Sequence, residues 1–479
     1  MKHAVRSTLA TLLVGVFGQR VLQLVSFLCI GRALGAERLG LYAQGIAVAA
    51  LAAVTAGAGV RTWMARAVVH DPGAAGELLF ASVRSRLWIG AVLATGGGVV
   101  AFVCSAEPWF WTLCLLQVLP AAFDLKNLLD VAGRTRAEVA LESATALLQL
   151  LLVLAWLSAG GRDLTSLAAI ALGSRCAYAL LALPAIRRVG RANATATARS
   201  VPRVDVGLGV AVSQGLHGVL TAGDIWFVAL CFGDGAAGHY AVATRFAGAA
   251  LLPSAQLARL LLPHTLRAGA GGDPRQTLTT ATRATLLVTL PMLAGGAAVA
   301  PQLCTLPGAV FAGAAPALVL ALLSGCLQHA GWQQSSALLA AGRDRAYVAT
   351  LLLPSALHLL LFGGGAALAA QLAPTPATAA AWSAGFAVAA HAVYFFGGAA
   401  AVRELRPPAL VPIGGAVRTA LTTGVAAALP AVFWDGPGLL ALQLGAGAAA
   451  FAFCLWRVEL RGRLGRVGDG LAAASGFRA

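Results

Sequence analysis

The chain has 479 residues, of which 59% are hydrophobic and 11% are charged, whereas soluble domains carry about a quarter charged residues. This composition excludes a soluble globular domain and indicates a polytopic membrane protein. The formal net charge of +16 would suit a nucleic-acid partner, but the positions of the basic residues between apolar runs exclude it.

Fourteen apolar runs are long enough to cross a bilayer, which takes roughly 20 residues. No polar stretch between them is long enough to bury a core of its own. We therefore predict an all-α polytopic membrane protein with about 14 transmembrane helices. The predicted spans are 9–31, 40–63, 82–104, 109–131, 138–160, 164–186, 206–230, 239–262, 282–304, 315–340, 347–371, 378–401, 412–434 and 438–456.

The first run follows Lys2 and Arg6 and in this respect resembles a signal peptide. It is longer than 20 residues, contains Gln19 and Arg20, and leads into further spans. We interpret it as an uncleaved first helix.

The basic residues favour one side of the membrane. With a cytoplasmic N-terminus, nearly all loop arginines fall on the cytoplasmic side, and the opposite loops hold only Arg32, Arg38 and Arg162. This positive-inside bias predicts an even number of spans and two cytoplasmic termini. It also predicts attraction to anionic membrane lipids.

The eight cysteines lie in or beside apolar runs and form no C-x-x-C pair, so we interpret them as small apolar side chains and predict no metal site. His329, His358 and His391 stand singly in apolar helices, which is typical of core histidines. The chain lacks a Gly-x-x-x-x-Gly-Lys motif, so direct ATP hydrolysis is not expected and no cofactor is predicted.

A pattern repeats between distant hairpins. The stretch LGAERLGLYA, 34–43, aligns with FGDGAAGHYA, 232–241, so that Gly35, Gly40 and Tyr42 fall on Gly233, Gly238 and Tyr240. Along the next helix the same offset brings Arg61 onto Arg259. We interpret both stretches as tight outer turns, because glycine accepts positive φ and lets helix ends approach closely.

A second pair of segments has nearly the same spacing. AGRTRAEVA, 132–140, matches AGRDRAYVA, 341–349. The two matches predict a duplicated six-span unit with parallel repeats. The expected organisation is an N-lobe with helices 1–6 (1–187), a basic cytoplasmic linker (188–205), a C-lobe with helices 7–12 (206–405), and helices 13–14 with a basic tail (406–479).

These stretches, together with FAGAAPALVLALL at 311–323, resemble the polysaccharide flippases of the multidrug/oligosaccharidyl-lipid/polysaccharide exporter superfamily. The resemblance covers roughly residues 5–405. It implies two six-helix lobes that carry a polyprenyl-diphosphate-linked oligosaccharide across the bacterial cytoplasmic (inner) membrane by alternating access. O-antigen, lipopolysaccharide and exopolysaccharide biosynthesis are the implied settings, with polymerase machinery as an implied partner. Fourteen spans are also similar to the lipid II flippases.

Ionisable and polar residues inside spans are the candidates for the cavity, because a charge at the centre of a span costs at least ~2.5 kcal/mol. Arginine pairs with phosphate oxygens and stays charged when partly buried. The predicted substrate-binding residues are Arg20, Gln19, Gln23, Arg175 and Arg245. Each arginine has a structural alternative, namely an ion pair or a side chain that reaches the interface.

Asp224 lies inside the seventh predicted span, with His217 two turns before it. Two roles are open for this carboxylate: a counter-ion to a cavity arginine, or a proton-coupling group whose pKa is raised by desolvation.

Charged residues also gather at predicted cytoplasmic helix ends. Lys126 and Asp130 are spaced i, i+4 and can pair along one helix face. We interpret them as part of a hairpin contact or cytoplasmic gate. The full predicted gate is Asp124, Lys126, Asp130, Glu142, Arg61 and Arg259.

Two other function classes are open. An integral membrane glycosyltransferase or ligase would need acidic residues in a sizeable outer loop, and the outer loops here are short. A drug exporter of the same superfamily would be expected to use an acidic cavity for cationic drugs, whereas the intramembrane excess here is arginine.

Overall fold

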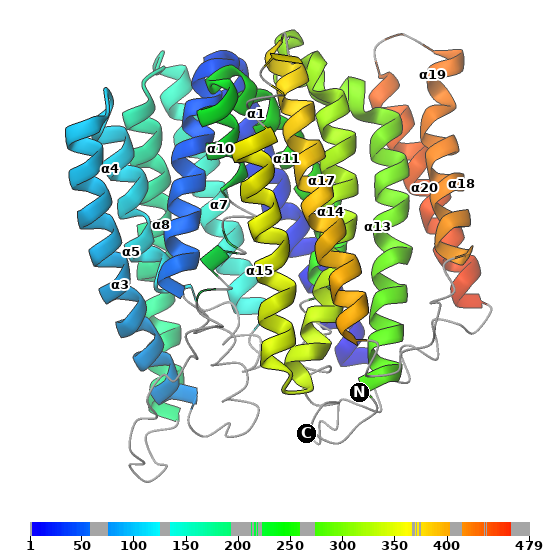
Figure 1. Cartoon of the computed structure of the whole chain (residues 1–479), viewed down its shortest axis with the longest axis horizontal. Coiled ribbons are helices and arrows are strands. Elements are labelled where there is room, and N and C mark those ends of the chain that lie inside the picture. Colours follow the sequence, from blue (N-terminus) through cyan, green and yellow to red (C-terminus); the bar gives the residue numbers. More distant parts are fainter. Residues whose placement is uncertain are drawn as a thin grey trace. The chain divides into compact units, whose positions relative to one another are not determined.

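The computed structural model describes residues 2–57, 75–124, 135–192, 223–258, 274–365, 375–402, 414–434 and 438–460, with residues 212, 215, 216, 218, 369, 371, 372 and 436 (Figure 1). Every regular element in this part of the chain is a helix. Each of the fourteen predicted spans contains helical residues, and the predicted all-α polytopic fold class is confirmed.

The chain divides into two compact units. The N-terminal unit is Val5–Gly238, and the C-terminal unit is His239–Ala479 with residues 1–4. The lobe boundary predicted at 188–205 lies largely outside the described residues and stays a prediction.

In the N-terminal unit, α1 (Lys2–Gly57) holds the first two spans, which are joined at Gly35. α3 (Ala75–Cys104), α4 (Pro108–Leu116) and the short α5 (Val118–Ala121) follow, and then α7 (Thr135–Ser158), α8 (Leu164–Ala192) and α10 (Asp224–Phe232). α8 packs against α3, α4 and α7. Lipid-facing character is evident on α3, where Trp88 and Val103 are 71% and 79% exposed.

The C-terminal unit contains most of α11 (Asp234–Ala250), then α13 (Pro274–Thr305), the 3-10 turn η2 (Ala309–Ala314), α14 (Ala315–Ala340) and α15 (Asp344–Leu360). A π-helical turn, η3 (Leu361–Gly365), precedes α17 (Pro376–Ala401). The last helices are α18 (Gly414–Ala428), α19 (Pro430–Phe433) and α20 (Leu439–Leu460). α14 packs on α13 and α17, while α18 packs between α13 and α20. The final helix pair is thus attached to this unit through α13.

Eight helices in the described ranges are long and apolar enough to cross a membrane. Shorter apolar helices at Pro108–Ala121 and Leu439–Leu455 correspond to the fourth and fourteenth predicted spans. The chain is therefore a multi-span helical membrane protein.

The two repeated turns have the same backbone conformation. Gly35 has φ 75° and ψ −177°, and its counterpart Gly233 has φ 86° and ψ 169°. L-residues with a side chain rarely adopt positive φ, which explains why both copies have glycine here. The two turns that the sequence predicted to be equivalent therefore also share the backbone angles of their glycines.

The same two turns pack against each other within the N-terminal unit. A side chain at Gly40 would overlap the backbone oxygen of Asp234, and one at Gly238 would overlap that of Ala36. Ala36 and Asp234 are themselves equivalent positions of the repeat, so the contact is reciprocal. The Gln44 amide adds a 2.7 Å hydrogen bond from Nε2 to Asp234 Oδ1. We name the residues Ala36, Gly40, Gln44, Asp234 and Gly238 the turn contact.

The turn between α7 and α8 ends in a helix cap. Asp163 Oδ2 accepts a 2.7 Å hydrogen bond from the Ser166 amide, and its Oδ1 accepts a 3.4 Å bond from the Trp156 indole. Hydrogen bonding from the Ser166 side chain, supported by these two bonds, lowers the pKa of the Asp163 carboxyl. Asp163 thus satisfies an amide at the start of α8 in its ionised form.

Asp163→Ala is expected to lower the free energy of unfolding by about 1 kcal/mol at pH 7, because the cap is lost. The folded pKa is depressed, so this contribution is present above the unfolded pKa of about 3.9 and is lost as the pH falls through the folded pKa. The free energy of unfolding in detergent, measured at pH 7 and at pH 3, checks the sign of this pH dependence. Asp163→Asn is the control, because asparagine caps equally well at both pH values. If the difference in free energy of unfolding between wild type and Asp163→Ala were the same at pH 3 as at pH 7, Asp163 would not act as an ionised cap.

Candidate functional site

Arg175 is an exposed residue in the middle of α8. Its Nε donates a 3.1 Å hydrogen bond to Oε1 of Gln117, whose own side chain is only 2% exposed. Asp124 and Tyr42 act on the guanidinium electrostatically. The two Nη groups make no hydrogen bond with the residues that the structure describes. Arg175 is therefore held through Nε, which leaves both Nη groups for another acceptor.

Gln117 is placed by a break in the fourth span. α4 ends at Leu116 and α5 begins at Val118, and the Gln117 amide bonds to the oxygen of Cys114, three residues back, instead of four. Pro120 has no amide hydrogen and cannot continue the α-helical pattern at this point. The break turns the Gln117 side chain into the unit, where it meets α8.

Arg86 on α3 supports the same break. This arginine is 3% exposed, and its Nη2 and Nη1 donate bonds of 2.6 Å and 3.3 Å to the backbone oxygens of Ala121 and Asp124. Carbonyls at a helix end have no partner within the helix, and a buried cation satisfies them. The sequence analysis did not single out Arg86 among the basic residues and missed this role. Its position inside the apolar run 82–104 was the available signal.

The first helix carries the other predicted arginine of this unit. Arg20 is exposed, and its Nη1 donates a 3.1 Å bond to Oε1 of Gln23, one turn away. Gln19 is 8% exposed and faces the interior of the unit. In the described ranges Arg20 and Arg175 donate to different acceptors, Gln23 and Gln117.

Asp224 is the first residue of α10 and is 9% exposed. A carboxylate is favoured at this position because the helix N-terminus carries a partial positive charge. His217, its predicted companion, lies outside the described residues. Arg245 on α11 is partly buried in the C-terminal unit.

The predicted gate is only partly described. Asp124 and Glu142 are both partly buried, and Asp124 contributes its backbone oxygen to the bond with Arg86. Glu138, which lies near them in the sequence, is fully buried on α7. Lys126, Asp130, Arg61 and Arg259 lie outside the described residues.

The core histidines of the C-terminal unit have serine or aromatic neighbours. His329 Nδ1 lies 2.9 Å from Ser254 Oγ, and His391 Nδ1 lies 2.6 Å from Ser324 Oγ. His358 is fully buried with its ring centroid 4.7 Å from that of Phe362. These surroundings fit the interpretation of core residues. Within the described ranges, no three His, Cys, Asp or Glu residues gather closely enough to hold a metal ion.

No family model and no curated protein matches this chain. Solved structures do match it. The lipid II flippase MurJ, in an inward closed conformation, aligns with a TM-score of 0.62 over 93% of this chain and 98% of its own, at 12% identity. A MOP superfamily transporter from Pyrococcus furiosus, whose binding pocket is described as reversed in polarity, aligns with a TM-score of 0.59 over 85% and 96%, at 16% identity.

A multidrug resistance transporter of the MATE family, in an inward-facing conformation, aligns with a TM-score of 0.58 over 82% of this chain and 96% of its own, at 15% identity. All three are members of one structural group at low identity, and the likeness shows the fold. The chain therefore has the fold of the MOP superfamily transporters.

Proposed function

We propose that this protein is a flippase that carries a polyprenyl-diphosphate-linked oligosaccharide across the bacterial cytoplasmic membrane by alternating access, for surface polysaccharide biosynthesis. The observation that carries the proposal is Arg175. Its guanidinium lies within a membrane span, is fixed through Nε by Gln117, and has both Nη groups available.

A phosphate group suits this arrangement. Two Nη donors on one edge of a planar guanidinium match two phosphate oxygens, and the pairing is strongest where water is partly excluded. An arginine within a span costs at least ~2.5 kcal/mol, and an anionic ligand would offset this cost together with Asp124. A diphosphate between a lipid chain and a sugar is such a ligand.

Other residues are candidates for the same role within each unit. Arg20, which donates to Gln23 and is next to Gln19, would supply a second guanidinium in the N-terminal unit, and Arg245 is the candidate of the C-terminal unit. Asp224 and His217 would act as counter-ion or coupling groups. Asp124, Lys126, Asp130, Glu142, Arg61 and Arg259 would form the cytoplasmic gate.

Lipid II export is the second candidate, and one observation favours it. The lipid II flippase aligns with 93% of this chain, whereas the MATE transporter aligns with 82%. The longer match suits a fourteen-helix carrier of a lipid-linked sugar. Cationic drugs suit the site less well, because an exposed arginine repels them.

Two carboxylates in the predicted outer turns argue against an enzyme. Asp163 caps α8 and Asp234 bonds to Gln44, so both already have structural partners. Neither is available as the acidic group that a glycosyltransferase or ligase would need there. We propose that the protein catalyses no covalent step.

The test is leaflet-resolved labelling of undecaprenyl-diphosphate oligosaccharide in cells depleted of the protein and complemented with variants. Arg175→Ala is expected to slow the appearance of glycan on the outer leaflet at least tenfold, with Arg175→Lys intermediate, because lysine loses the two-donor edge. Arg20→Ala is expected to slow it less.

Arg32→Ala is the control, because Arg32 is exposed on α1 and makes no hydrogen bond in the described ranges. Normal outward labelling in depleted cells, with no second transporter present, would refute the flippase. Labelling of lipid II instead of the surface glycan precursor would favour the second candidate.

A further inference from the structure

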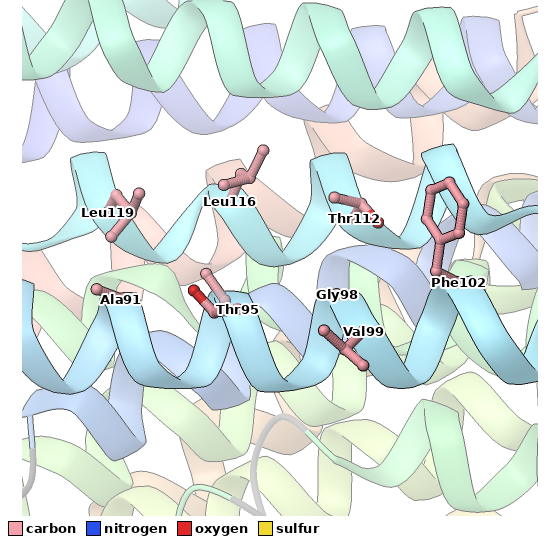
Figure 2. A pocket seen from close by; sticks show the side chains of 9 residues that line it. Ala91, Thr95, Gly98, Val99, Phe102, Thr112, Leu116 and Leu119 are labelled. Carbon is pink, nitrogen blue, oxygen red and sulfur yellow. The ribbon is translucent and has the colours of Figure 1, made fainter.

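A groove of about 360 Å³ lies between α3 and the α4–α5 segment, and neither Arg175 nor Gln117 lines it (Figure 2). One wall consists of Ala91, Thr95, Gly98 and Phe102 on α3, and Leu116 and Leu119 form part of the other. Figure 2 shows the two rows facing each other, with Ala91 opposite Leu119 at one end and Phe102 at the other. The lining is apolar apart from two threonines, so it suits a hydrocarbon chain.

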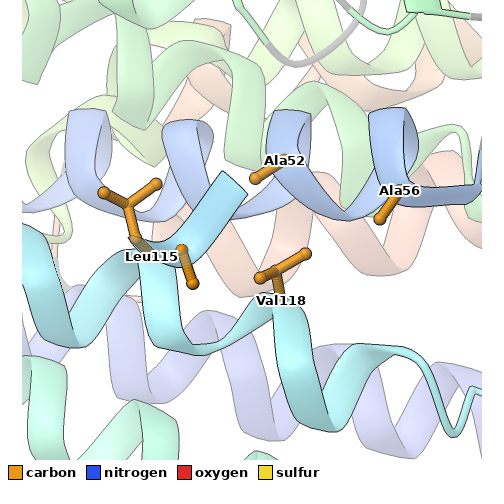
Figure 3. Packing of buried hydrophobic residues seen from close by; sticks show 5 residues of the cluster. Ala52, Ala56, Leu115 and Val118 are labelled. Carbon is orange, nitrogen blue, oxygen red and sulfur yellow. The ribbon is translucent and has the colours of Figure 1, made fainter. Parts of the chain in front are cut away.

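The floor of the groove is a packed core. Ala94 belongs to a buried cluster with Ala52, Ala56, Leu115 and Val118, which joins the second half of α1 to α3 and α4 (Figure 3). Leu116 and Leu119, which line the groove, pack against this cluster. The groove therefore has a closely packed base.

A cation stands on α3 beyond the Ala91 end of the groove. Arg84 stands two turns before Ala91 and four turns before Gly98, so it projects from the same stripe of the helix. Arg84 is exposed and makes no hydrogen bond or ion pair in the described part of the chain. Trp88, 71% exposed, stands between Arg84 and the groove, as aromatic side chains do at membrane interfaces.

The dimensions fit a lipid. From Ala91 to Phe102 the groove runs about 16 Å, close to half the roughly 30 Å hydrocarbon core, and it begins about 10 Å from Arg84. At the far end the Phe102 ring meets that of Trp109 edge-on at 5.3 Å. A cation, an aromatic residue and an apolar channel in line match a charged headgroup followed by an acyl chain.

From these observations we propose that the groove binds one acyl chain of an anionic phospholipid whose headgroup pairs with Arg84. This inference does not depend on the proposed function. A helix of a second copy would need a wider surface and would leave Arg84 without an anion, so the lipid accounts for more of the site. Bound lipid would steady the α3–α4 pair, on which Gln117 and Arg175 depend.

The test is native mass spectrometry of the purified protein with phosphatidylglycerol and with phosphatidylcholine of identical chains. Wild type is expected to retain one phosphatidylglycerol in preference to phosphatidylcholine. Gly98→Leu fills the groove, because a Cβ there has its nearest neighbour, Thr112 Cγ2, at 3.8 Å and meets no backbone; it should weaken retention of both lipids about tenfold. Arg84→Gln should weaken retention of phosphatidylglycerol about fivefold and leave retention of phosphatidylcholine unchanged.

Gly96→Leu is the matched control, since Gly96 is exposed on the same helix, does not line the groove and has open space at its Cβ. It should bind lipid as wild type does. If Gly98→Leu does not fold, Ala91→Leu tests the opposite end of the groove. Equal retention by Gly98→Leu and Gly96→Leu, equal binding of the two lipids by wild type, or loss of a dimer in Gly98→Leu would each overturn the proposal.

Discussion

Gly238→Ala and Gly40→Ala are each expected to lower the free energy of unfolding by about 1–3 kcal/mol, the usual range for overpacking. In both cases the added methyl group would overlap a backbone oxygen, of Ala36 or of Asp234, and backbone yields less easily than a side chain. The turn contact must then open, which also weakens the 2.7 Å hydrogen bond between Gln44 and Asp234. Unfolding of the purified protein in mixed detergent micelles measures the loss.

The double variant with both Gly40→Ala and Gly238→Ala is a stricter test of this prediction. Once either methyl group has separated the two turns, the second finds space, so the combined loss should be clearly smaller than the sum of the two. Gly18→Ala on α1 and Gly248→Ala on α11 are matched controls, because neither glycine has a neighbouring atom within 4 Å of its Cβ position. Additive losses, or single variants as stable as the controls, would show that the turn contact is not under steric constraint.

Arg86→Met is expected to lower the free energy of unfolding by about 2–4 kcal/mol, because two hydrogen bonds from a buried, charged donor are lost. Methionine occupies much of the same volume, so the effect reports lost hydrogen bonding more than lost packing. We also expect the fourth span to shift near Gln117, which would slow the glycan transport that we propose for Arg175. Detergent unfolding and the leaflet-labelling assay measure the two effects.

Arg32→Met serves as the control, since Arg32 is exposed and contacts no carbonyl in the described ranges. Arg86→Lys keeps the charge but removes the planar guanidinium. Its single ammonium group cannot bond to the Ala121 and Asp124 oxygens in the same geometry, so it should recover only part of the lost free energy of unfolding. Full stability of Arg86→Met would mean that water or another donor satisfies the helix end.

Several features of this protein were predictable because they depend on local chemistry. Backbone groups in a bilayer must be bonded within their own segment, so long apolar runs predict helices whatever their neighbours are. The repeated turns were also predictable, because positive φ at Gly35 and Gly233 requires glycine at a set distance from each apolar run. The equivalence of Arg61 with Arg259 and the lobe boundary stay predictions, since they fall outside the described residues.

The contacts that shape the candidate site depend on which helices pack together. Arg175 and Gln117 are 58 residues apart, and Gln44 and Asp234 are 190 apart. These helices are apolar on most sides, so their patterns do not reveal which face meets a neighbour and which meets lipid. The partners of Arg86, the oxygens of Ala121 and Asp124, could not be inferred for the same reason. The sequence by itself determined the helices and their turns, whereas the partners of Arg175, Arg86 and Gly40 were decided by tertiary packing, because membrane helices associate through shape and small residues instead of through a hydrophobic pattern.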